Sequence, residues 1–538
     1  MLSSDKNDAG PLRFGARGFE AGCRLQGAAL TVFAAVMLAG CGGGGGVSGQ
    51  TVPASAGQSN PAPATSQPDI IQSSELSANI CSAPRTGIDP STGMRYPDRQ
   101  GTSADEKNWV RAWIDETYLW YDEIPSGLRA LTYSTPQAFF DVLRTTAVTP
   151  SGKPRDRFHF TYDTAVWQAL SRSGIEAGYG FELAIVKSQV PRELRIAYTE
   201  PGTPASAAGI TRGARIVLVD GIDVVTSPGV EALNAALFPK AAGQAHTFRL
   251  QELDGSLRTV SLTSAQITKT PVQNVRTLDT ATGKIGYLLF NDHVQTSEAQ
   301  LIAAMAKFKA DGVQDLMLDI RYNGGGLLTI ASELAFMVAR PEATTGAVFE
   351  RLQFNRKNPF QLTEADTTTP FQSKSLGFSG PEGQPLPQLG LSRVTVLTGP
   401  DTCSASESII NGLRGVNVEV NVIGNITCGK PYGFIPRDNC GTTYFAIQFK
   451  GVNNQGFGDY ADGIAPTCVV ADDFSRPLGD PAEGRLAAAL GYRVTGACPP
   501  VATGLAKAGV LESGEPLVSG KSPARTGRFL GPGAFSPR

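Results

Sequence analysis

Strand-like and helix-like patterns alternate between residues 284 and 495. Short apolar runs that predict strands occur at 284–290, 315–320, 393–397 and 418–423. Amphipathic stretches that predict helices lie between or after them, at 297–309, 327–338 and 404–414. Residues 341–388 are rich in loop-forming residues and are interpreted as an insertion. This alternation predicts an α/β fold for the region.

The composition narrows the chemistry that the chain can perform. The net charge is −2, so no global basic field indicates a nucleic-acid partner. The three histidines are His159, His246 and His293, too few for a histidine-rich metal site and few for a Ser-His or Cys-His mechanism. The 61 glycines and 36 prolines exceed the usual combined share of about 12% and predict long loops.

The N-terminus predicts export. Basic residues precede an apolar run at 28–38, which is too short for a bilayer span and has the length of a signal-peptide core. The following Leu-Ala-Gly-Cys41 resembles a bacterial lipobox, which implies a lipoprotein signal peptide over 1–40, acylation of Cys41 and a membrane anchor in the bacterial cell envelope. An ordinary secretory signal is the alternative. Residues 41–75 have the composition of a flexible tether.

Six cysteines remain besides Cys41 once the signal peptide is removed: Cys81, Cys403, Cys428, Cys440, Cys468 and Cys498. An even number in an exported chain predicts disulfides, with 15 possible pairings. Zinc is the weaker alternative, because the chain has no CxxC pair.

Residues 76–172 are predicted to form a small helical N-terminal domain. Trp109, Trp113 and Trp120 fall at helical spacing, and 136–143 repeats the pattern, so we expect helix across 103–148. The aromatic stripe is interpreted as core. Residues 156–162 predict a short strand or connector.

Residues 173–267 are predicted to be β-rich, with strands at 178–186, 194–198, 215–219 and 247–251. The segments 178–181, 201–210 and 213–224 resemble a PDZ domain. The resemblance implies that an extended peptide binds at a sheet edge and that the amides of Tyr179, Gly180 and Phe181 capture its C-terminal carboxylate. Alternatively, the domain is a spacer and its glycines only form turns.

Three further segments contain candidate catalytic or anion-binding groups. In the first, Leu318-Asp-Ile-Arg-Tyr-Asn-Gly-Gly-Gly326, a strand runs into glycines that open a helix, where backbone N–H groups favour negative charge. The segment lacks the Lys-Ser/Thr that follows a phosphate loop. A plain tight turn is the alternative.

The second segment is Asp401-Thr-Cys-Ser-Ala-Ser-Glu-Ser-Ile-Ile410. Ser404 lies where a strand meets a helix, so its oxygen could lie at the helix N-terminus beside the free amide of Ala405. Alternatively, Ser404 is a plain N-cap, with Glu407 completing a Ser-x-x-Glu capping box.

The third segment is Gly424-Asn-Ile-Thr-Cys-Gly-Lys-Pro-Tyr-Gly433, which places Lys430 just after an apolar strand. A lysine acts as a general base only where burial or nearby charge lowers its pKa from about 10.4 toward neutrality. A solvated surface lysine is the alternative.

Together and in this order, the three segments resemble the carboxyl-terminal-processing (tail-specific) serine peptidases. The resemblance implies a crotonase-like α/β core over 268–498, protein or peptide substrates bound by their C-termini, and no cofactor or metal. It assigns Ser404 as nucleophile and Lys430 as general base. The oxyanion would be bound by the amide of Ala405 and that of Gly324 or Gly325.

The chain departs from this family in two ways. Phe434 stands where many members have a glutamine, so the group that orients Lys430 is open; Gln448, Asn439 and Ser406 are guesses. Cys403 and Cys428 are also unusual: if Ser404 and Lys430 touch, these cysteines are close enough to bond, but Cys428–Cys440 is an equal alternative.

Three other functions remain open. The chain could be a non-catalytic peptide-binding lipoprotein, use His159 or His293 in catalysis, or use Cys403 as nucleophile. The Gly/Pro/Ser-rich residues 499–538 predict a disordered tail.

Overall fold

The computed structural model describes residues 73–90, 92–500 and 528–529. The predicted signal peptide, Cys41, most of the predicted tether and nearly all of the predicted tail therefore lie outside the described residues. Within the described residues, no helix combines the length and apolarity needed to cross a bilayer.

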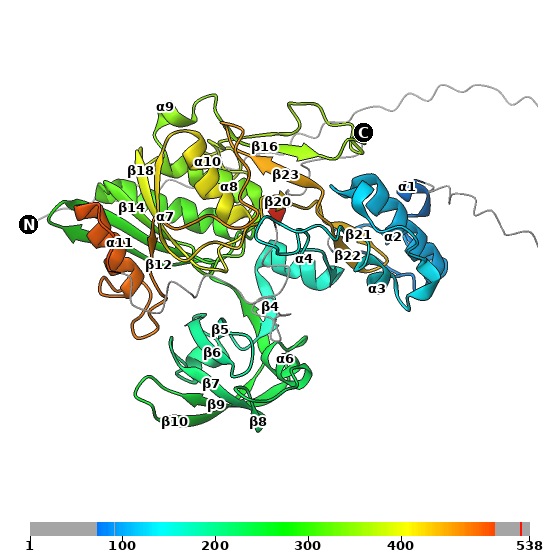
Figure 1. The fold of residues 1–538 in the computed structure, drawn as a ribbon, viewed down its shortest axis with the longest axis horizontal. Helices are drawn as coiled ribbons and strands as arrows, with labels where there is room; N and C mark the ends of the chain where they lie inside the picture. The colour runs from blue at the N-terminus through cyan, green and yellow to red at the C-terminus, as the bar shows by residue number, and fades with distance from the viewer. Residues whose placement is uncertain (1–72, 91, 501–527, 530–538) are drawn as a thin grey trace, which may run out of the picture. The chain divides into compact units, whose positions relative to one another are not determined.

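A six-stranded mixed sheet forms the centre of the α/β region (Figure 1). Its order is β12 (Val272–Thr280), β13 (Gly283–Phe290), β14 (Asp315–Asp319), β18 (Arg393–Thr398), β19 (Glu419–Gly424) and β24 (Cys468–Val469). Only β12 pairs antiparallel; the other neighbours are parallel. The predicted α/β pattern is thus present, with strand bounds within about one residue of the expected ones.

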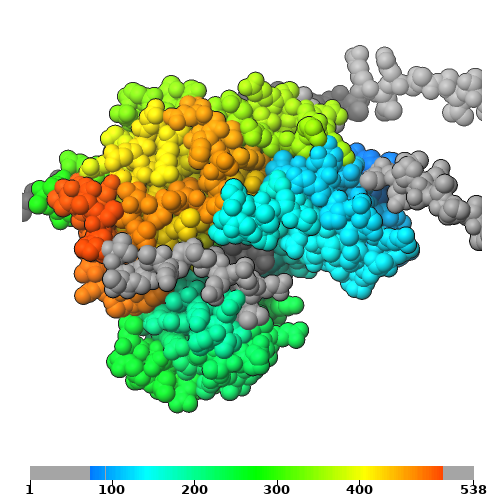
Figure 2. Space-filling view, viewed as in Figure 1, coloured from blue at the N-terminus to red at the C-terminus, as the bar shows by residue number. Residues whose placement is uncertain are grey.

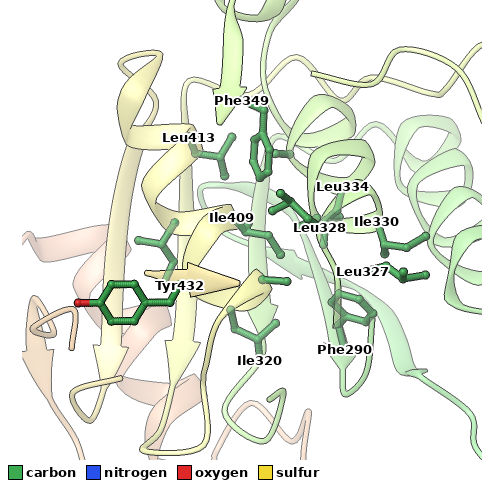
Figure 3. Close-up of a cluster of buried hydrophobic side chains, with 14 of the residues drawn as sticks. Phe290, Ile320, Leu327, Leu328, Ile330, Leu334, Phe349, Ile409, Leu413 and Tyr432 are labelled. Atoms are coloured by element: carbon green, nitrogen blue, oxygen red, sulfur yellow. The ribbon is translucent and has the colours of Figure 1, made fainter. Parts of the chain in front are cut away.

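Helices cover both faces of this sheet. On one face, α7 (Ser297–Asp311), α8 (Leu328–Val338) and α10 (Ala405–Gly415) pack on Leu288 and Leu318. On the other face, α11 (Gly484–Thr495) packs on Tyr287 and Met317. Alternate residues of each strand serve opposite faces, so these buried strands are apolar almost throughout. Figure 3 shows part of the first core, in which Phe290, Leu328 and Ile409 are labelled.

The stretch interpreted as an insertion contributes to a second sheet. It contains α9 (Pro341–Thr344), β16 (Val348–Phe354) and β17 (Thr368–Pro370). The sheet order is β17, β16, β23 (Phe449–Val452) and β20 (Tyr432–Gly433). Phe349 of β16 is buried in the main core, so this stretch is part of the folded region rather than a free loop.

The N-terminal region has less helix than expected. Its elements are α1 (Ser74–Ser77), β1 (Ile80–Cys81), β2 (Arg99–Gln100), α2 (Ser103–Thr117), α3 (Pro136–Phe140), β3 (Phe160–Asp163) and α4 (Thr164–Ser173), with 3₁₀ turns at Tyr121–Glu123 and Ala130–Thr132. The helical stretch expected over 103–148 is confirmed only in α2 and α3: between them Tyr118 is extended, and the Leu119 N–H donates to the Ile447 carbonyl at 2.8 Å. Trp109 and Trp113 are buried and stacked, as expected for core residues.

Two links join this region to the α/β region. β3 pairs with β22 (Thr442–Phe445), which also pairs with β21 (Arg437–Asn439). A disulfide connects Cys81 to Cys440. Figure 2 shows the N-terminal residues in blue and cyan.

The intervening β-rich region has its own core. Its sheet contains β10 (Leu257–Thr263), β9 (Ala245–Gln251), β7 (Arg215–Val219), β6 (Glu193–Thr199) and β5 (Phe181–Lys187) in order, with β8 (Ile222–Asp223) beside β7. The short helix α5 (Pro204–Ala207) and α6 (Glu231–Leu237) pack on it. The chain enters and leaves through the paired strands β4 (Ile175–Gly178) and β11 (Ala265–Thr268).

Candidate active site

Ser404 occupies a strained turn between β18 and α10. It is fully buried and has φ +61° and ψ −116°, a conformation that costs a non-glycine residue about 1–3 kcal/mol. Among the described residues its Oγ has no hydrogen-bond partner. The Ser404 N–H donates to Glu407 Oε2 at 2.8 Å, but the Oγ does not accept in return. Ser404 is thus the N-cap residue of α10 in a capping-box arrangement with Glu407, as the alternative expects, but its Oγ makes no hydrogen bond within the described residues.

The glycine loop lies directly against this turn. A Cβ on Gly325 would fall 2.9 Å from the Ser404 Cβ and 2.8 Å from the Cys403 carbonyl oxygen, so only glycine fits, with φ +102°. The Gly325 N–H donates to Asn323 Oδ1 at 3.0 Å and is already engaged. Of the two glycines expected to offer an oxyanion donor, the geometry therefore favours Gly324.

The amides of Gly324 and Ala405 donate to no other group in the described part of the chain. Ala405 is the first residue of α10, where backbone N–H groups lack intrahelical partners and the helix dipole favours negative charge. These two amides and the Ser404 Oγ are therefore polar groups at this turn without a hydrogen-bond partner among the described residues.

Lys430 is fully buried beside two aromatic rings. Its Nζ lies 4.0 Å from the ring centroid of Phe434 and 4.7 Å from that of Phe158. The expectation of a solvated surface lysine is excluded. Phe434 thus contacts the lysine through its ring face.

Two connections hold the Ser404 turn to the Lys430 loop. The first is a disulfide between Cys403 and Cys428, with Cα atoms 5.1 Å apart. Cys428 is therefore not bonded to Cys440, and Cys403 is not a free nucleophile. The third disulfide joins Cys468 and Cys498.

The second connection is the buried carboxylate of Glu407. It accepts the backbone N–H groups of Ser404, Gly429 and Lys430, each at 2.8 Å, and the hydroxyl of Thr427. Burial raises the pKa of Glu407, while these donors lower it. The Ser-x-x-Glu spacing predicts only a helix cap for Glu407 and does not indicate its contact with residues 427–430.

The three side chains suggested as orienting groups for Lys430 bond elsewhere. Ser406 Oγ donates to the Asn323 carbonyl at 3.0 Å, Gln448 Oε1 accepts the Ile435 N–H at 2.6 Å, and Asn439 Oδ1 accepts the Asn79 N–H at 2.8 Å.

The histidines occupy structural positions. His159 stacks on Phe140, and its Nε2 lies 2.9 Å from the Phe140 carbonyl oxygen. His293 lies behind the glycine loop, with Nδ1 3.0 Å from Asn323 Oδ1. Burial lowers the pKa of His293 to about 3, so it is neutral across the physiological range. His246 pairs with Asp220 in the β-rich region.

One group of side chains in the described residues has metal-ligand spacing: Cys403, Glu407 and Cys428, whose ligand atoms lie within 4.8 Å of one another. The two sulfurs are bonded to each other, so they offer no thiolates. These residues therefore do not fit a zinc ion in the disulfide-bonded protein.

Tyr179, Gly180 and Phe181 lie far from this site in sequence, at the start of edge strand β5. Gly180 has φ +87°, and a Cβ there would fall 2.2 Å from the Thr203 side chain. The Tyr179 hydroxyl donates to the Ala236 carbonyl of α6 at 2.9 Å, so this loop joins β5 to the neighbouring helix.

Comparison with known proteins finds similarity to one peptidase family over part of the chain. Residues 284–469 match the model of peptidase family S41, and residues 105–161 match the peptidase S41 N-terminal domain. A carboxyl-terminal-processing protease of Picosynechococcus sp. is 29% identical over 262 residues, which cover 48% of this chain and 56% of that protein. A chloroplastic C-terminal processing peptidase of Tetradesmus obliquus is 28% identical over 251 residues, covering 44% and 50%.

The matched region thus spans about half the length of these curated relatives. Among solved structures, a Bacteroides fragilis protein described as a candidate S41 protease superposes with a TM-score of 0.55 and 25% identity, covering 74% of this chain and 98% of that one. Over residues 105–161 and 284–469 the chain is thus similar to peptidase family S41, and its curated relatives include carboxyl-terminal-processing proteases.

Proposed function

We propose that the chain is a serine endopeptidase in which Ser404 is the nucleophile and Lys430 the general base. The observation that carries this proposal is the strained, buried Ser404, whose unpartnered Oγ lies at the start of α10. Strain of this kind persists only where the surrounding structure imposes it, and it concentrates at functional sites.

The chemistry follows from the groups present. The mechanism uses Lys430, whose side chain is fully buried, as a neutral amine. The amine takes the proton of Ser404 as its Oγ attacks a peptide carbonyl, and the ammonium then protonates the leaving amine. Water hydrolyses the acyl-enzyme with the same base. The Gly324 and Ala405 amides stabilise the tetrahedral oxyanion, a contribution of about 10²–10³ in rate per donor.

Substitution of the two reacting residues tests this mechanism. Ser404→Ala and Lys430→Ala should each reduce cleavage of an unfolded protein substrate by at least about 10³-fold, since each removes a group that moves in the reaction. Ser392→Ala and Lys309→Ala, at exposed positions, are matched controls and should retain full activity. Undiminished cleavage by either active-site variant would contradict the mechanism.

A second candidate function is a non-catalytic peptide-binding protein that retains the peptidase fold. The position of Phe434 motivates it, because the Phe434 ring lies 4.0 Å from the Lys430 Nζ, where the family resemblance leads us to expect a glutamine. A fluorophosphonate probe separates the two functions. Labelling of the wild type but not of Ser404→Ala supports the peptidase, whereas absence of labelling in folded wild type supports the binding protein.

We further propose that residues 173–267 form a PDZ domain that binds substrate C-termini at the edge of β5. The edge position of β5 and the left-handed Gly180 support this role. Binding of a peptide with a free C-terminal carboxylate, and its loss on amidation of that carboxylate, is the expected result. Lipidation at Cys41 in the bacterial envelope is likewise proposed; Cys41→Ser should abolish incorporation of labelled fatty acid.

A further inference from the structure

Two short strands lie beside the proposed catalytic residues. β15 (Gly326–Leu327) follows the glycine loop, and one of its edges is paired: Gly326 bridges His293, and the Leu327 N–H donates to the His293 carbonyl at 2.8 Å. β20 follows Lys430 and pairs with β23. A strand edge left without a partner presents main-chain groups that bind another extended segment.

A segment from near the end of the sequence pairs with the second edge of β15. Arg528 and Phe529 form β25, which runs parallel to β15 in the register Gly326↔Arg528 and Leu327↔Phe529. β25 also contacts β20. It is the short red segment near the β20 label in Figure 1. The main chain of this segment therefore lies against both strands that leave the proposed site.

A segment paired with the second edge of β15 lies where a substrate peptide would have to lie to reach Ser404. Gly326 follows Gly325, which packs against Ser404 with no room for a side chain. An extended peptide paired with β15 therefore passes next to the nucleophile. Peptides bind strand edges in this manner because the main chain supplies the hydrogen bonds whatever the side chains are.

We propose that β15 and β20 form a main-chain binding groove for extended peptides and that the Arg528–Phe529 segment of this chain occupies it as an internal competitor of substrate. The inference rests on the proposed function, because it takes the groove as the substrate site. Pairing through the main chain makes the occupancy depend on backbone N–H groups more than on side-chain identity.

Proline substitution in the full chain tests the occupancy. The variant Arg528→Pro with Phe529→Pro removes two backbone N–H groups and should release the segment. A tethered segment has an effective concentration of about 1 mM, so for an intrinsic dissociation constant of about 0.1 mM its release should lower KM roughly tenfold. The kcat should not change, because a competitor is absent at saturating substrate.

Two matched variants separate main-chain pairing from other effects. Arg528→Ala with Phe529→Ala keeps both N–H groups and should keep the wild-type KM. Val510→Pro with Leu511→Pro places the same change elsewhere in the same part of the chain and should also keep it. A tenfold fall in KM for all three variants would contradict the pairing, as would an unchanged KM for the 528/529 proline variant.

A binding measurement makes the test independent of catalysis. A fluorescent synthetic peptide of residues 521–538 should bind the Ser404→Ala protein carrying the two prolines at 528 and 529, and bind at least tenfold more weakly when Ser404→Ala is present alone. Equal binding to both proteins would overturn the occupancy. Binding as expected with no cleavage by wild type or by the proline variant would overturn the proposed function alone; normal cleavage with equal KM and equal binding would overturn only this inference.

Discussion

Glu407 shows how one side chain can position two others. Its two oxygens accept three backbone N–H groups, one from the residue that carries the proposed nucleophile and one from the residue that carries the proposed base. A charge-assisted hydrogen bond is roughly twice as strong as a neutral one. Glu407 is thus a positioning residue: it accepts the backbone N–H groups of Ser404 and Lys430 and so fixes the two segments from which the Oγ and Nζ extend.

Replacing the Glu407 carboxylate should show whether Glu407 positions the proposed catalytic residues or only stabilises the fold. In Glu407→Gln, one oxygen becomes an NH₂ group that faces backbone donors, so two hydrogen bonds are lost at about 1–3 kcal/mol each. We expect kcat to fall about 10²-fold. Glu298→Gln is the matched control, because Glu298 is equally buried and also accepts three backbone N–H groups, from Leu376, Gly377 and Ser379.

Thermal unfolding and steady-state kinetics measure the two effects together. Both variants should lose several degrees of Tm, but only Glu407→Gln should lose kcat. An equal loss of kcat in both would show that Glu407 acts only through general stability.

At the scale of elements, the Cys403–Cys428 disulfide ties the β18–α10 turn to the loop after β19. It closes a separation of 25 residues, for which the chain-entropy relation gives about 3.5 kcal/mol. The Cys468–Cys498 disulfide closes a similar separation of 30 residues but joins β24 to the segment after α11. The Cys403–Cys428 and Cys468–Cys498 disulfides thus have similar expected stabilisation, but only Cys403–Cys428 spans the site.

Paired alanine substitutions should distinguish these bonds. Cys403→Ala with Cys428→Ala and Cys468→Ala with Cys498→Ala should each lower the free energy of unfolding by about 2–4 kcal/mol. Only the first pair should reduce kcat, by tenfold or more, because it frees the two backbones that Glu407 also holds. Equal kcat for both disulfide variants in a peptidase assay would show that Glu407 positions the site without help from the disulfide.

A carboxyl pair joins α7, α8 and the loop at 375–379. Burial, followed by the nearby charge of Glu298 and a hydrogen bond to it, raises the pKa of Glu333 on α8 to about 9. In the unfolded chain the same group titrates near its ordinary value of 4.5. The unfolded state therefore loses this proton first, so the contribution of Glu333 to stability declines as pH rises from about 4.5 to about 9 and is constant above that.

Glu333→Gln should remove this pH dependence, since an amide mimics the protonated carboxyl and does not titrate. Compared with the wild type, the variant should gain free energy of unfolding between pH 5 and pH 9, by at most about 1.4 kcal/mol per pH unit. Urea unfolding of both proteins at pH 5, 7 and 9 measures the difference. A difference that stays constant with pH would mean that Glu333 is ionised in the folded protein at neutral pH.

Elements that arise from a local sequence pattern could be predicted, whereas contacts between residues far apart in the sequence could not. The strands β13, β14, β18 and β19 and the helices α7, α8 and α10 were predicted within about two residues, because apolar periodicity is a local signal. Pairing of β3 with β22 and bonding of Cys81 to Cys440 join residues about 280 and 359 apart, which no periodicity encodes. The proximity of Ser404 to the Lys430 loop could be predicted only from the family resemblance. The role of Glu407 as a bridge could be predicted neither from apolar periodicity nor from that resemblance.

At the scale of the whole described region, one arginine connects the β-rich region to the α/β region. The Arg212 guanidinium, nine-tenths buried, donates to the Tyr322 hydroxyl at 2.6 Å and to Asp472 at 2.6 Å. Tyr322 immediately precedes Asn323, whose side chain holds the Gly325 amide. The same Asp472 also accepts from Arg321. A path of two hydrogen bonds and the Tyr322–Asn323 backbone thus runs from the proposed PDZ domain to the glycine loop.

Arg212→Met should weaken this connection while leaving both cores packed. Burial alone would raise the pKa of Asp472, but the charges of Arg485, Arg321 and Arg212 outweigh it and hold that pKa well below its ordinary 3.8. The ionised Asp472 carboxylate therefore stabilises the fold at pH values above 3.8. This contribution is lost as the pH falls from 3.8 toward the lowered pKa of the folded protein. With one of the three cations gone, we expect a loss of about 1–3 kcal/mol at neutral pH.

The pH dependence of this loss identifies its cause. The difference in free energy of unfolding between wild type and Arg212→Met should be constant from pH 5 to pH 9 and should narrow only in acid, below pH 3.8. Arg258→Met is the control within the β-rich region: its partner Glu252 lies in the same region and both side chains are partly exposed, so the loss should be below about 1 kcal/mol. If Arg212→Met also lowers kcat while Arg258→Met does not, the contacts through Tyr322 transmit the effect to the glycine loop. If Arg212→Met changes only the free energy of unfolding, the two regions are joined at Arg212 without any influence on the site.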